Sequence, residues 1–298
     1  MLDVFLEIIA PVLVMAALGG FVGRRFGVPA EVISNLAFNL FGPALVFSTL
    51  STLELTRSTA RTAIATVTMC VSLAIVSLAV SFVRGHDAPT RASVALGASV
   101  WNAGNMGLPV ALLAFGEPGL EIGVLVYVVA SMWGNSAGVV LASLAGGSAR
   151  GALVAPLRVP ALWAAAAGLI VNLTDVGLPE VVEVPAATLG GAAIPAMLVV
   201  LGLQLRFDVG RDGVSGLAQM TMIRLVGGPL IGLAATELLG VEGIAQDYLI
   251  IAGGMPIAVM TVVLATQYGA RANLLSRAIV LTTMLSIVTL TVLISIVT

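Results

Sequence analysis

The sequence contains no lysine, one cysteine, one histidine and few charged side chains of any kind. Cys70 lies in an apolar run without a partner for an intrachain disulfide, and His86 lies in a polar loop, so Cys- and His-based metal centres are excluded. Charged residues make up 9% of the chain, against about a quarter in ordinary soluble domains. Because 59% of the residues are hydrophobic, the chain lacks the polar surface to cover itself in water, which excludes a soluble domain.

Long unbroken apolar runs take the place of polar surface, and the mean hydropathy is +1.12. A membrane-spanning helix needs roughly 20 apolar residues, whereas a membrane β-barrel would show short alternating strands. We therefore predict an all-α integral membrane protein with about ten transmembrane helices. The predicted segments are 4–22, 33–53, 62–83, 92–115, 119–145, 158–175, 184–205, 214–237, 244–268 and 274–297.

The distribution of arginine predicts the orientation of these segments. Ten crossings place both termini on one side of the membrane. The first residues include Asp3 and Glu7 where a cleaved signal peptide would carry positive charge, and this favours a retained first helix with its N-terminus outside. Only Arg57 and Arg61 then lie in outer loops. Ten arginines lie in inner loops: Arg24, Arg25, Arg84, Arg91, Arg150, Arg158, Arg206, Arg211, Arg271 and Arg277. By the positive-inside rule, we expect a multi-pass protein of the cytoplasmic membrane with both termini on the extracytoplasmic side.

Two pairs of proline-containing motifs indicate an internal repeat. Pro43 and Pro195, in segments two and seven, are 152 positions apart, and Pro109 and Pro256, in segments four and nine, are 147 apart. Because five helices is an odd number, a second copy would enter the membrane from the opposite side, as in many secondary transporters. We predict a 5+5 inverted repeat, with a first repeat at 1–145, a short cytoplasmic connector at 146–157 and a second repeat at 158–298.

The most informative stretch is Trp101-Asn102-Ala103-Gly104-Asn105-Met106-Gly107-Leu108-Pro109, in the middle of segment four. Proline, glycine and asparagine all weaken a helix there, and the Gly254-Met255-Pro256 stretch weakens segment nine in the same way. Two broken helices at mid-membrane would present half-helix N-termini to an anion and free carbonyls to a cation. Ordinary proline kinks are the alternative. We take Asn102, Asn105, Gly107, Pro109, Gly254, Met255, Pro256 and Thr261 as candidate substrate-binding residues.

Arg224 is the only charged residue placed well inside a segment. An intramembrane arginine indicates a functional site, here a charge partner for the substrate, although snorkelling of its side chain toward the inner face is an equal alternative. Gln204, Asn135, Asn39, Ser48 and Gln267 lie on or near segments, where we expect structural roles for them. No Asp or Glu lies deep in a segment, no Walker loop occurs, and the motifs of intramembrane proteases are absent, so we expect a protein that is not an enzyme.

The Asn102–Pro109 stretch, Pro43, Met255-Pro256 and the ten-helix plan together resemble the auxin efflux carrier family over essentially the whole chain. This family includes the PIN auxin exporters of plants and bacterial carriers linked to malonate, malate and other small carboxylates. The short stretch from Gly146 to Leu157 differs from the long central loop of long plant members, so the similarity is greater to short bacterial carriers. The resemblance implies an architecture related to bile-acid symporters and sodium/proton antiporters, in which segments four and nine cross. It also implies a scaffold domain of helices 1, 2, 6 and 7 and an elevator-like transport domain of helices 3–5 and 8–10.

These observations predict a secondary transporter that moves a small organic anion, a mono- or dicarboxylate. A passive channel or a sensor built on a transporter fold is the alternative, and a structural scaffold without flux comes third. Sodium near Asn102 and Thr261, protons, and uncoupled transport all stay open, and no other cofactor is expected. The lipid bilayer is the expected surrounding, nucleic acid is not an expected partner, and the sequence leaves open a homodimer through the scaffold domain.

Overall fold

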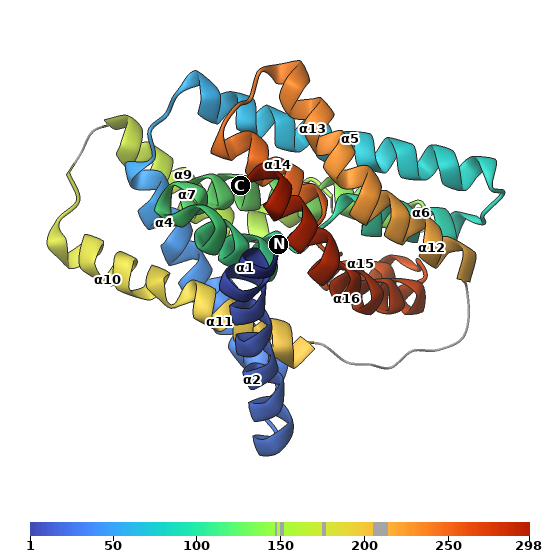
Figure 1. Cartoon of the computed structure of the whole chain (residues 1–298), viewed down its shortest axis with the longest axis horizontal. Coiled ribbons are helices and arrows are strands. Elements are labelled where there is room, and N and C mark those ends of the chain that lie inside the picture. The colour runs from blue at the N-terminus through green and yellow to red at the C-terminus, as the bar shows by residue number, and fades with distance from the viewer. Residues whose placement is uncertain (147, 150–151, 175–176, 205–213) are drawn as a thin grey trace.

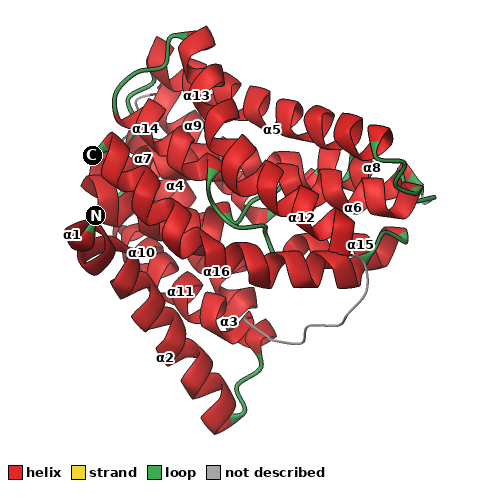
Figure 2. Ribbon diagram, turned by 45° about the vertical axis from the view of Figure 1, so that its right-hand side comes forward, coloured by secondary structure: helices red, strands yellow, loops and turns green. Residues whose placement is uncertain are grey.

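The computed structural model of the chain describes residues 1–146, 148–149, 152–174, 177–204 and 214–298. Within these ranges the chain forms helices and no strands (Figures 1 and 2). The predicted inner-loop residues Arg150, Arg206 and Arg211 and part of the predicted connector lie outside the described residues. In chain order the elements are α1 (Leu2–Val4), η1 (Phe5–Ile9), α2 (Ala10–Phe26), α3 (Ala30–Leu36), η2 (Ala37–Phe41), α4 (Gly42–Thr52), α5 (Arg57–Val83), α6 (Ala88–Ser99), η3 (Ala103–Gly107), α7 (Leu108–Asn135), α8 (Ala137–Ser143), η5 (Ala155–Arg158), α9 (Pro160–Thr174), α10 (Glu180–Gly191), α11 (Ala193–Gln204), α12 (Val214–Met222), η6 (Ile223–Gly227), α13 (Gly228–Leu239), α14 (Ile244–Gly253), α15 (Met260–Tyr268) and α16 (Ala272–Val297).

Seven helices among the described residues are long and apolar enough to cross a membrane: Leu2–Phe26, Ala30–Thr52, Arg57–Val83, Ala103–Ser143, Glu180–Gln204, Gly216–Leu239 and Ala272–Val297. Pro160–Thr174 and Ile244–Gly253 are shorter apolar helices. The 41-residue stretch Ala103–Ser143 contains a sharp break at Gly116, whose φ of 67° and ψ of −156° suit only glycine. The prediction of long apolar helices is therefore confirmed for the described residues, while the count of ten crossings and the inverted repeat stay predictions.

The prolines explain the local irregularities of these helices. Each π-helical segment in the described ranges (η1, η2, η3 and η6) ends two residues before a proline, and these prolines are Pro11, Pro43, Pro109 and Pro229. A proline inside a helix removes one N–H donor and its ring clashes with the carbonyl four residues earlier. A wider π turn moves that carbonyl away from the ring, so the helix bends without ending.

The helices pack mainly in two groups, which we call the first group (η1, α2, α3, η2, α4, α9, α10 and α11) and the second group (α5, η3, α6–α8, η6 and α12–α16). In the first group α2 packs on α11 and α4 packs on α9. In the second group α5 packs on α6 and α13, and α13 packs on α14 (Figure 1). The groups meet where α11 contacts η3, where α4, α9 and α11 contact α7, and where η1 contacts α7 and α16.

Two glycines allow the backbones of α2 and α11 in the first group to approach one another closely. A Cβ built on Gly202 of α11 would overlap the carbonyl of Ala16 on α2, and a Cβ on Gly19 would lie 2.6 Å from the Val199 carbonyl oxygen. Such close backbone approach is the usual way that small residues join membrane helices, because lipid provides no hydrophobic driving force between them.

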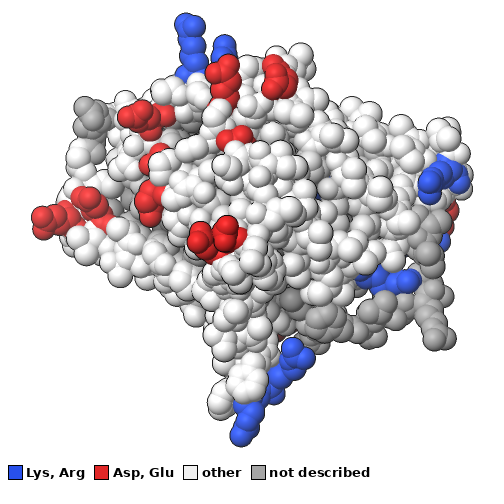
Figure 3. Space-filling view, in the orientation of Figure 1, with Lys and Arg blue, Asp and Glu red and all other residues white. Residues whose placement is uncertain are grey.

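Apart from Arg224, every charged side chain of the described residues is at least partly exposed. Acidic side chains gather toward the upper left of Figure 3, and basic ones lie at the top edge, at the free end of α2 and toward the right-hand side. Asp87 begins α6 by accepting a hydrogen bond from the Thr90 N–H, and its carboxylate lies 2.6 Å from the Arg271 guanidinium just before α16. The hydrogen bond with Arg271 lowers the pKa of Asp87 to about 2, so this carboxylate stays ionised at neutral pH.

The close contact between α2 and α11 predicts a strong position effect for added methyl groups. Gly202→Ala must push α11 away from α2, and overpacking of this kind costs about 1–3 kcal/mol of unfolding free energy. Gly191→Ala is the matched control, because a Cβ there meets nothing within 4 Å. We expect Gly202→Ala to lower the thermal midpoint of the purified protein and Gly191→Ala to leave it unchanged or raise it; equal midpoints would contradict the packing described above.

Candidate functional site

Two interrupted helices cross near the centre of the second group. Helix α6 ends at Ser99 and helix α14 ends at Gly253, and non-helical backbone follows each of them. These two breaks pair with one another as a single antiparallel bridge between Trp101 and Ile257. The Asn102 N–H donates to the Pro256 carbonyl at 2.8 Å, and the Ala258 N–H donates to the Val100 carbonyl at 3.1 Å. The bridge satisfies backbone groups that lipid could not, which is the condition for unwound chain at membrane depth.

Arg224, on η6, holds the ends of both interrupted helices. Its side chain is fully buried, and it donates to the carbonyl of Ala98 on α6 at 2.9 Å and to the carbonyl of Ala252 on α14 at 3.1 Å. It also donates to the Gly253 carbonyl. These carbonyls belong to the last turns of the two helices, where the backbone has no further helical donor. One guanidinium thus caps two helix C-termini, and its side chain is buried and does not extend to the surface.

The surroundings of Arg224 keep it in this place. Its guanidinium carbon lies 5.2 Å from the centre of the Trp101 ring, within the range of a cation–π interaction. A Cβ on Gly228 would overlap the Gly253 carbonyl and would lie 2.8 Å from Nη2 of Arg224, so glycine is required for this approach. Among the described residues, Arg224 is the only charged side chain that is buried.

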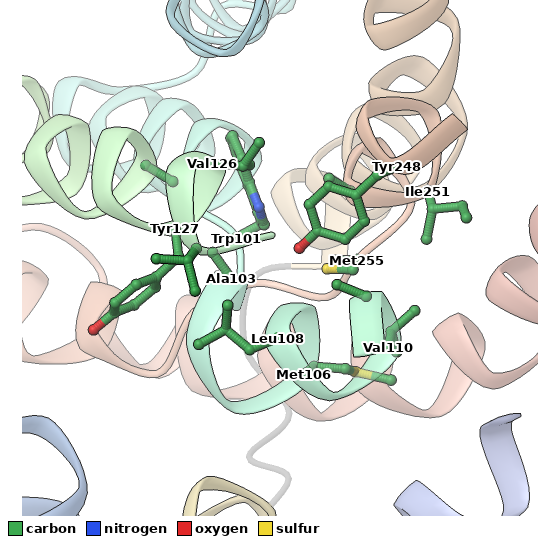
Figure 4. Close-up of a cluster of buried hydrophobic side chains, with 14 of the residues drawn as sticks. Trp101, Ala103, Met106, Leu108, Val110, Val126, Tyr127, Tyr248, Ile251 and Met255 are labelled. Carbon is green, nitrogen blue, oxygen red and sulfur yellow. The ribbon is translucent and has the colours of Figure 1, made fainter. Parts of the chain in front are cut away.

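Tightly packed side chains fix the far side of the crossover. Figure 4 shows Tyr248 of α14 beside Met255, close to the turn that carries Met106 and Leu108. A Cβ on Gly107 would lie 3.0 Å from the Tyr248 hydroxyl oxygen and 3.3 Å from the Met255 sulfur. This side of the crossover is therefore a core, whereas the opposite side is open.

A cavity of about 420 Å³ lies on that open side, between the two groups of helices. The first turns of η3 and α15 line it, because Asn102–Asn105 and Ala258–Met260 all lie on its wall. The polar residues of its wall are Ser34, Asn39, Asn102, Asn105, Ser131, Asn135, Arg158 and Gln204. The cavity thus faces the N-terminal ends of the two helices that follow the breaks, while Arg224 sits at the C-terminal ends of the two that precede them.

The structure brings together only some of the residues predicted from the sequence. Asn102 and Asn105 both line the cavity. Gly107, Pro109, Gly254, Met255, Pro256 and Thr261 are buried and do not line it. Thr261 uses its hydroxyl to donate to the Ala258 carbonyl at 2.7 Å, so it closes the first turn of α15. Among the described residues, no three His, Cys, Asp or Glu side chains gather as metal ligands.

The amides of the cavity form a chain of hydrogen bonds. Asn102 begins η3, and its Oδ1 accepts from the Asn105 N–H at 3.2 Å. Nδ2 of Asn105 donates to Oε1 of Gln204 at 3.3 Å, and Nε2 of Gln204 donates to the Ser34 hydroxyl at 3.4 Å. Oδ1 of Asn105 is buried without a partner. Rotating both amides together by half a turn keeps both hydrogen bonds with donors and acceptors exchanged, and turns the unpaired oxygen into an unpaired N–H donor.

Sequence reasoning placed Gln204 among structural residues and did not single out Ser34 or Arg158 as cavity residues. All three lie at predicted inner ends of segments two, six and seven, far from Asn102 in the sequence. A polar residue repeated at the same end of several segments is the signal that could have pointed to a shared cavity.

The double role of Arg224 predicts a large effect of removing it. Arg224→Leu leaves three buried carbonyls without a donor, and each unsatisfied buried group costs about 1–3 kcal/mol. We expect a clear fall in the thermal midpoint, with Arg224→Lys intermediate because a single ammonium lacks the planar fork. Arg61→Leu is the control: Arg61 is exposed and caps α13 through the Gly240 carbonyl at 3.2 Å. A fall no larger for Arg224→Leu than for Arg61→Leu would show that the capping contributes little.

Comparison with known proteins shows the family of the chain. The chain matches the family described as membrane transport protein over residues 4–147 and 148–294. It is 27% identical over 291 residues, which cover 95% of both chains, to an uncharacterized transporter of Methanothermobacter thermautotrophicus. It is also 27% identical over 194 residues, which cover 62% of each chain, to an uncharacterized transporter of Methanocaldococcus jannaschii. The chain therefore belongs to the membrane transport protein family, the auxin efflux carrier family that its sequence motifs resemble.

Proposed function

We propose that this protein is a secondary transporter that carries a small organic anion, a mono- or dicarboxylate, across the cytoplasmic membrane. The observation that supports this most directly is the electrostatic asymmetry of the crossover. Each helix end carries roughly half an elementary charge, positive at the N-terminus and negative at the C-terminus. The unit charge of Arg224 offsets the two C-termini, whereas the two N-termini face the cavity without a compensating acidic side chain.

The residues of the cavity wall suit a carboxylate. Among the described residues no carboxylate is buried near the crossover, so the positive ends of η3 and α15 have no anionic partner within the protein. Nδ2 of Asn102 has no hydrogen-bond partner in the described residues, and Asn105 supplies a second amide on the same wall. Arg158, exposed on the cavity rim, adds one positive charge where an anion would enter. A volume of about 420 Å³ is in the range of small-molecule sites.

An elevator movement is supported by the division into two groups. We assign the first group as the scaffold domain and the second group as the transport domain, because the complete crossover, with Arg224 and the pairing of its two breaks, belongs to the second group. A second cavity of about 550 Å³ also lies between the groups, lined by Leu45 and Ile194 of the first and by Leu112, Glu117 and Leu120 of α7. In the predicted topology the crossover cavity opens inward and this second cavity opens outward. Movement of the second group could therefore expose the site to either side.

The predicted topology also fits this assignment. Ten crossings in a 5+5 inverted repeat would relate α6 to α14 and the η3–α7 start to α15, which matches the antiparallel pairing of the two breaks. Sodium and protons are both alternatives to uncoupled transport.

Removal of one cavity amide tests the substrate site. Hydrogen bonds to charged groups contribute about 1.5–3 kcal/mol, so Asn102→Ala should raise the KM for malonate or malate uptake into proteoliposomes by about tenfold to a hundredfold. Gln267→Ala is the matched control, because Gln267 is exposed on α15 outside the cavity wall. Saturable flux with an unchanged KM in Asn102→Ala would place the site elsewhere, and flux that never saturates would favour a channel.

Thiol labelling in intact cells tests the sidedness. In a Cys70→Ala background, we expect a membrane-impermeant maleimide to label Thr298→Cys at the C-terminus and to leave Val83→Cys unlabelled until the cells are opened. Val83 is exposed at the end of α5, and the predicted topology places this end of the helix on the inner side of the membrane. The reverse pattern would invert the topology and the assignment of the inner cavity.

A further inference from the structure

The wall of the crossover cavity carries a single charged side chain among the described residues, that of Arg158. Arg158 is the last residue of η5 and lies shortly before α9, with its side chain exposed at the cavity rim. It forms no hydrogen bond or ion pair with any described residue, whereas Arg271 is paired with Asp87. An unpaired arginine on the wall of an anion site is available to bind a ligand.

The backbone around Arg158 is fixed, although its side chain is free. Pro156 and Pro160 limit the backbone angles on both sides of it. The Trp163 indole N–H donates to the Leu157 carbonyl at 2.8 Å, which ties η5 to the first turn of α9. The structure therefore holds an unpaired arginine at a defined place on the wall of the cavity.

The crossover end of the cavity provides donors for one carboxylate. Asn105 is 4% exposed, lines the cavity and has one amide atom without a partner, and Asn102 begins a helix that continues into α7. The rings of Phe38 and Tyr127 lie next to these amides, because a Cβ on Gly104 would be 3.5 Å from the first ring and 3.2 Å from the second. A second carboxylate placed here would lose its hydration against carbon, without a cation to compensate.

The positive charge around the cavity sums to about two elementary charges. The N-terminal ends of the η3–α7 helix and of α15 contribute roughly half a charge each, and Arg158 contributes one. No acidic side chain of the described residues lines this cavity. A monocarboxylate would offset about half of this charge, whereas a dicarboxylate with its two groups apart would offset all of it.

We propose that Arg158 is a specificity-determining residue that binds the second carboxylate of a dicarboxylate, while the crossover amides hold the first. A guanidinium suits this role because it can donate two parallel hydrogen bonds to one carboxylate. This inference rests on the anion site of the proposed function and narrows its substrate to the dicarboxylates.

A series of compounds of nearly equal size tests this assignment. Malonate carries two carboxylates, malonamate has one of them replaced by an amide, and succinate and succinamate form a longer pair of the same kind. The Kd of each compound comes from the concentration dependence of the thermal midpoint of the purified protein at constant ionic strength. We expect the unchanged protein to bind each dicarboxylate more tightly than its monoamide.

Arg158→Gln should remove this preference by weakening the binding of the dicarboxylate alone. Exposed ion pairs contribute little and bidentate arginine–carboxylate pairs contribute more, so we expect the Kd of the dicarboxylate to rise about three- to tenfold and that of the monoamide to stay unchanged. Arg158→Lys keeps the charge without the two parallel donors, so its preference should be intermediate. Arg84→Gln is the matched control, because Arg84 is exposed directly after α5 and does not line the cavity.

The outcomes separate this inference from the proposed function. Equal Kd values for a dicarboxylate and its monoamide in the unchanged protein would overturn the role of Arg158 and leave the anion site intact. A preference that survives in a folded Arg158→Gln protein, or that falls equally in Arg84→Gln, would do the same. Absence of binding by all four compounds would reject the proposed function, and the role of Arg158 with it.

Discussion

The contact on which the rest of the structure depends is that of Arg224 with the ends of α6 and α14. Each of these helices stops inside the protein, and each would leave carbonyls that neither lipid nor a following helical turn can satisfy. One buried guanidinium donates to both ends and stacks on Trp101 at the point where the two breaks pair. Without it, the crossover would have two exposed negative helix ends in a region of low polarity, where uncompensated charge is most costly.

The consequence of that contact is an imbalance of charge between the two ends of the crossover. The positive charge of Arg224 offsets the C-terminal ends of α6 and α14. No buried acidic side chain in the described residues offsets the N-terminal ends of η3 and α15. A protein with an aspartate at that place would complete the site itself and would bind a cation or a proton. This chain leaves the place open, lines it with amides, and puts Arg158 at its rim. This imbalance is the basis of our proposal that an anion completes the crossover.

The sequence was informative where a local signal reports a local structure. Pro109, Pro256 and the neighbouring glycines indicated the two broken helices, and the structure has both breaks. Pairing of the breaks with each other and the capping by Arg224 depend on residues about 30 to more than 120 positions apart, and no local pattern carries such contacts. The sequence therefore left Arg224 evenly divided between a functional and a snorkelling role.

The residues of the cavity also show how far a local sequence pattern can predict a site. Asn102 and Asn105 could be singled out because two amides beside a proline are unusual at mid-membrane. Gln204 and Ser34 could not, because an amide or a hydroxyl at a helix end is common and acquires its meaning only from the packing of α11 and α3 against η3. Thr261 and Met255 lie beside the motif in sequence, yet packing directs them into turn closure and core. A position beside the motif in the sequence is therefore a weaker indication that a residue lines the cavity than a position on the open side of the crossover.

The central claim is that the crossover is completed by an anion, and ligand-induced stabilisation of the purified protein tests it most directly. A ligand that binds only the folded state raises the thermal midpoint in a saturable way. We predict that small mono- and dicarboxylates such as malonate and malate stabilise the protein, while malonamide, which is nearly the same size and uncharged, does not. Equal stabilisation by malonate and malonamide, or stabilisation by small organic cations in place of the carboxylates, would contradict it.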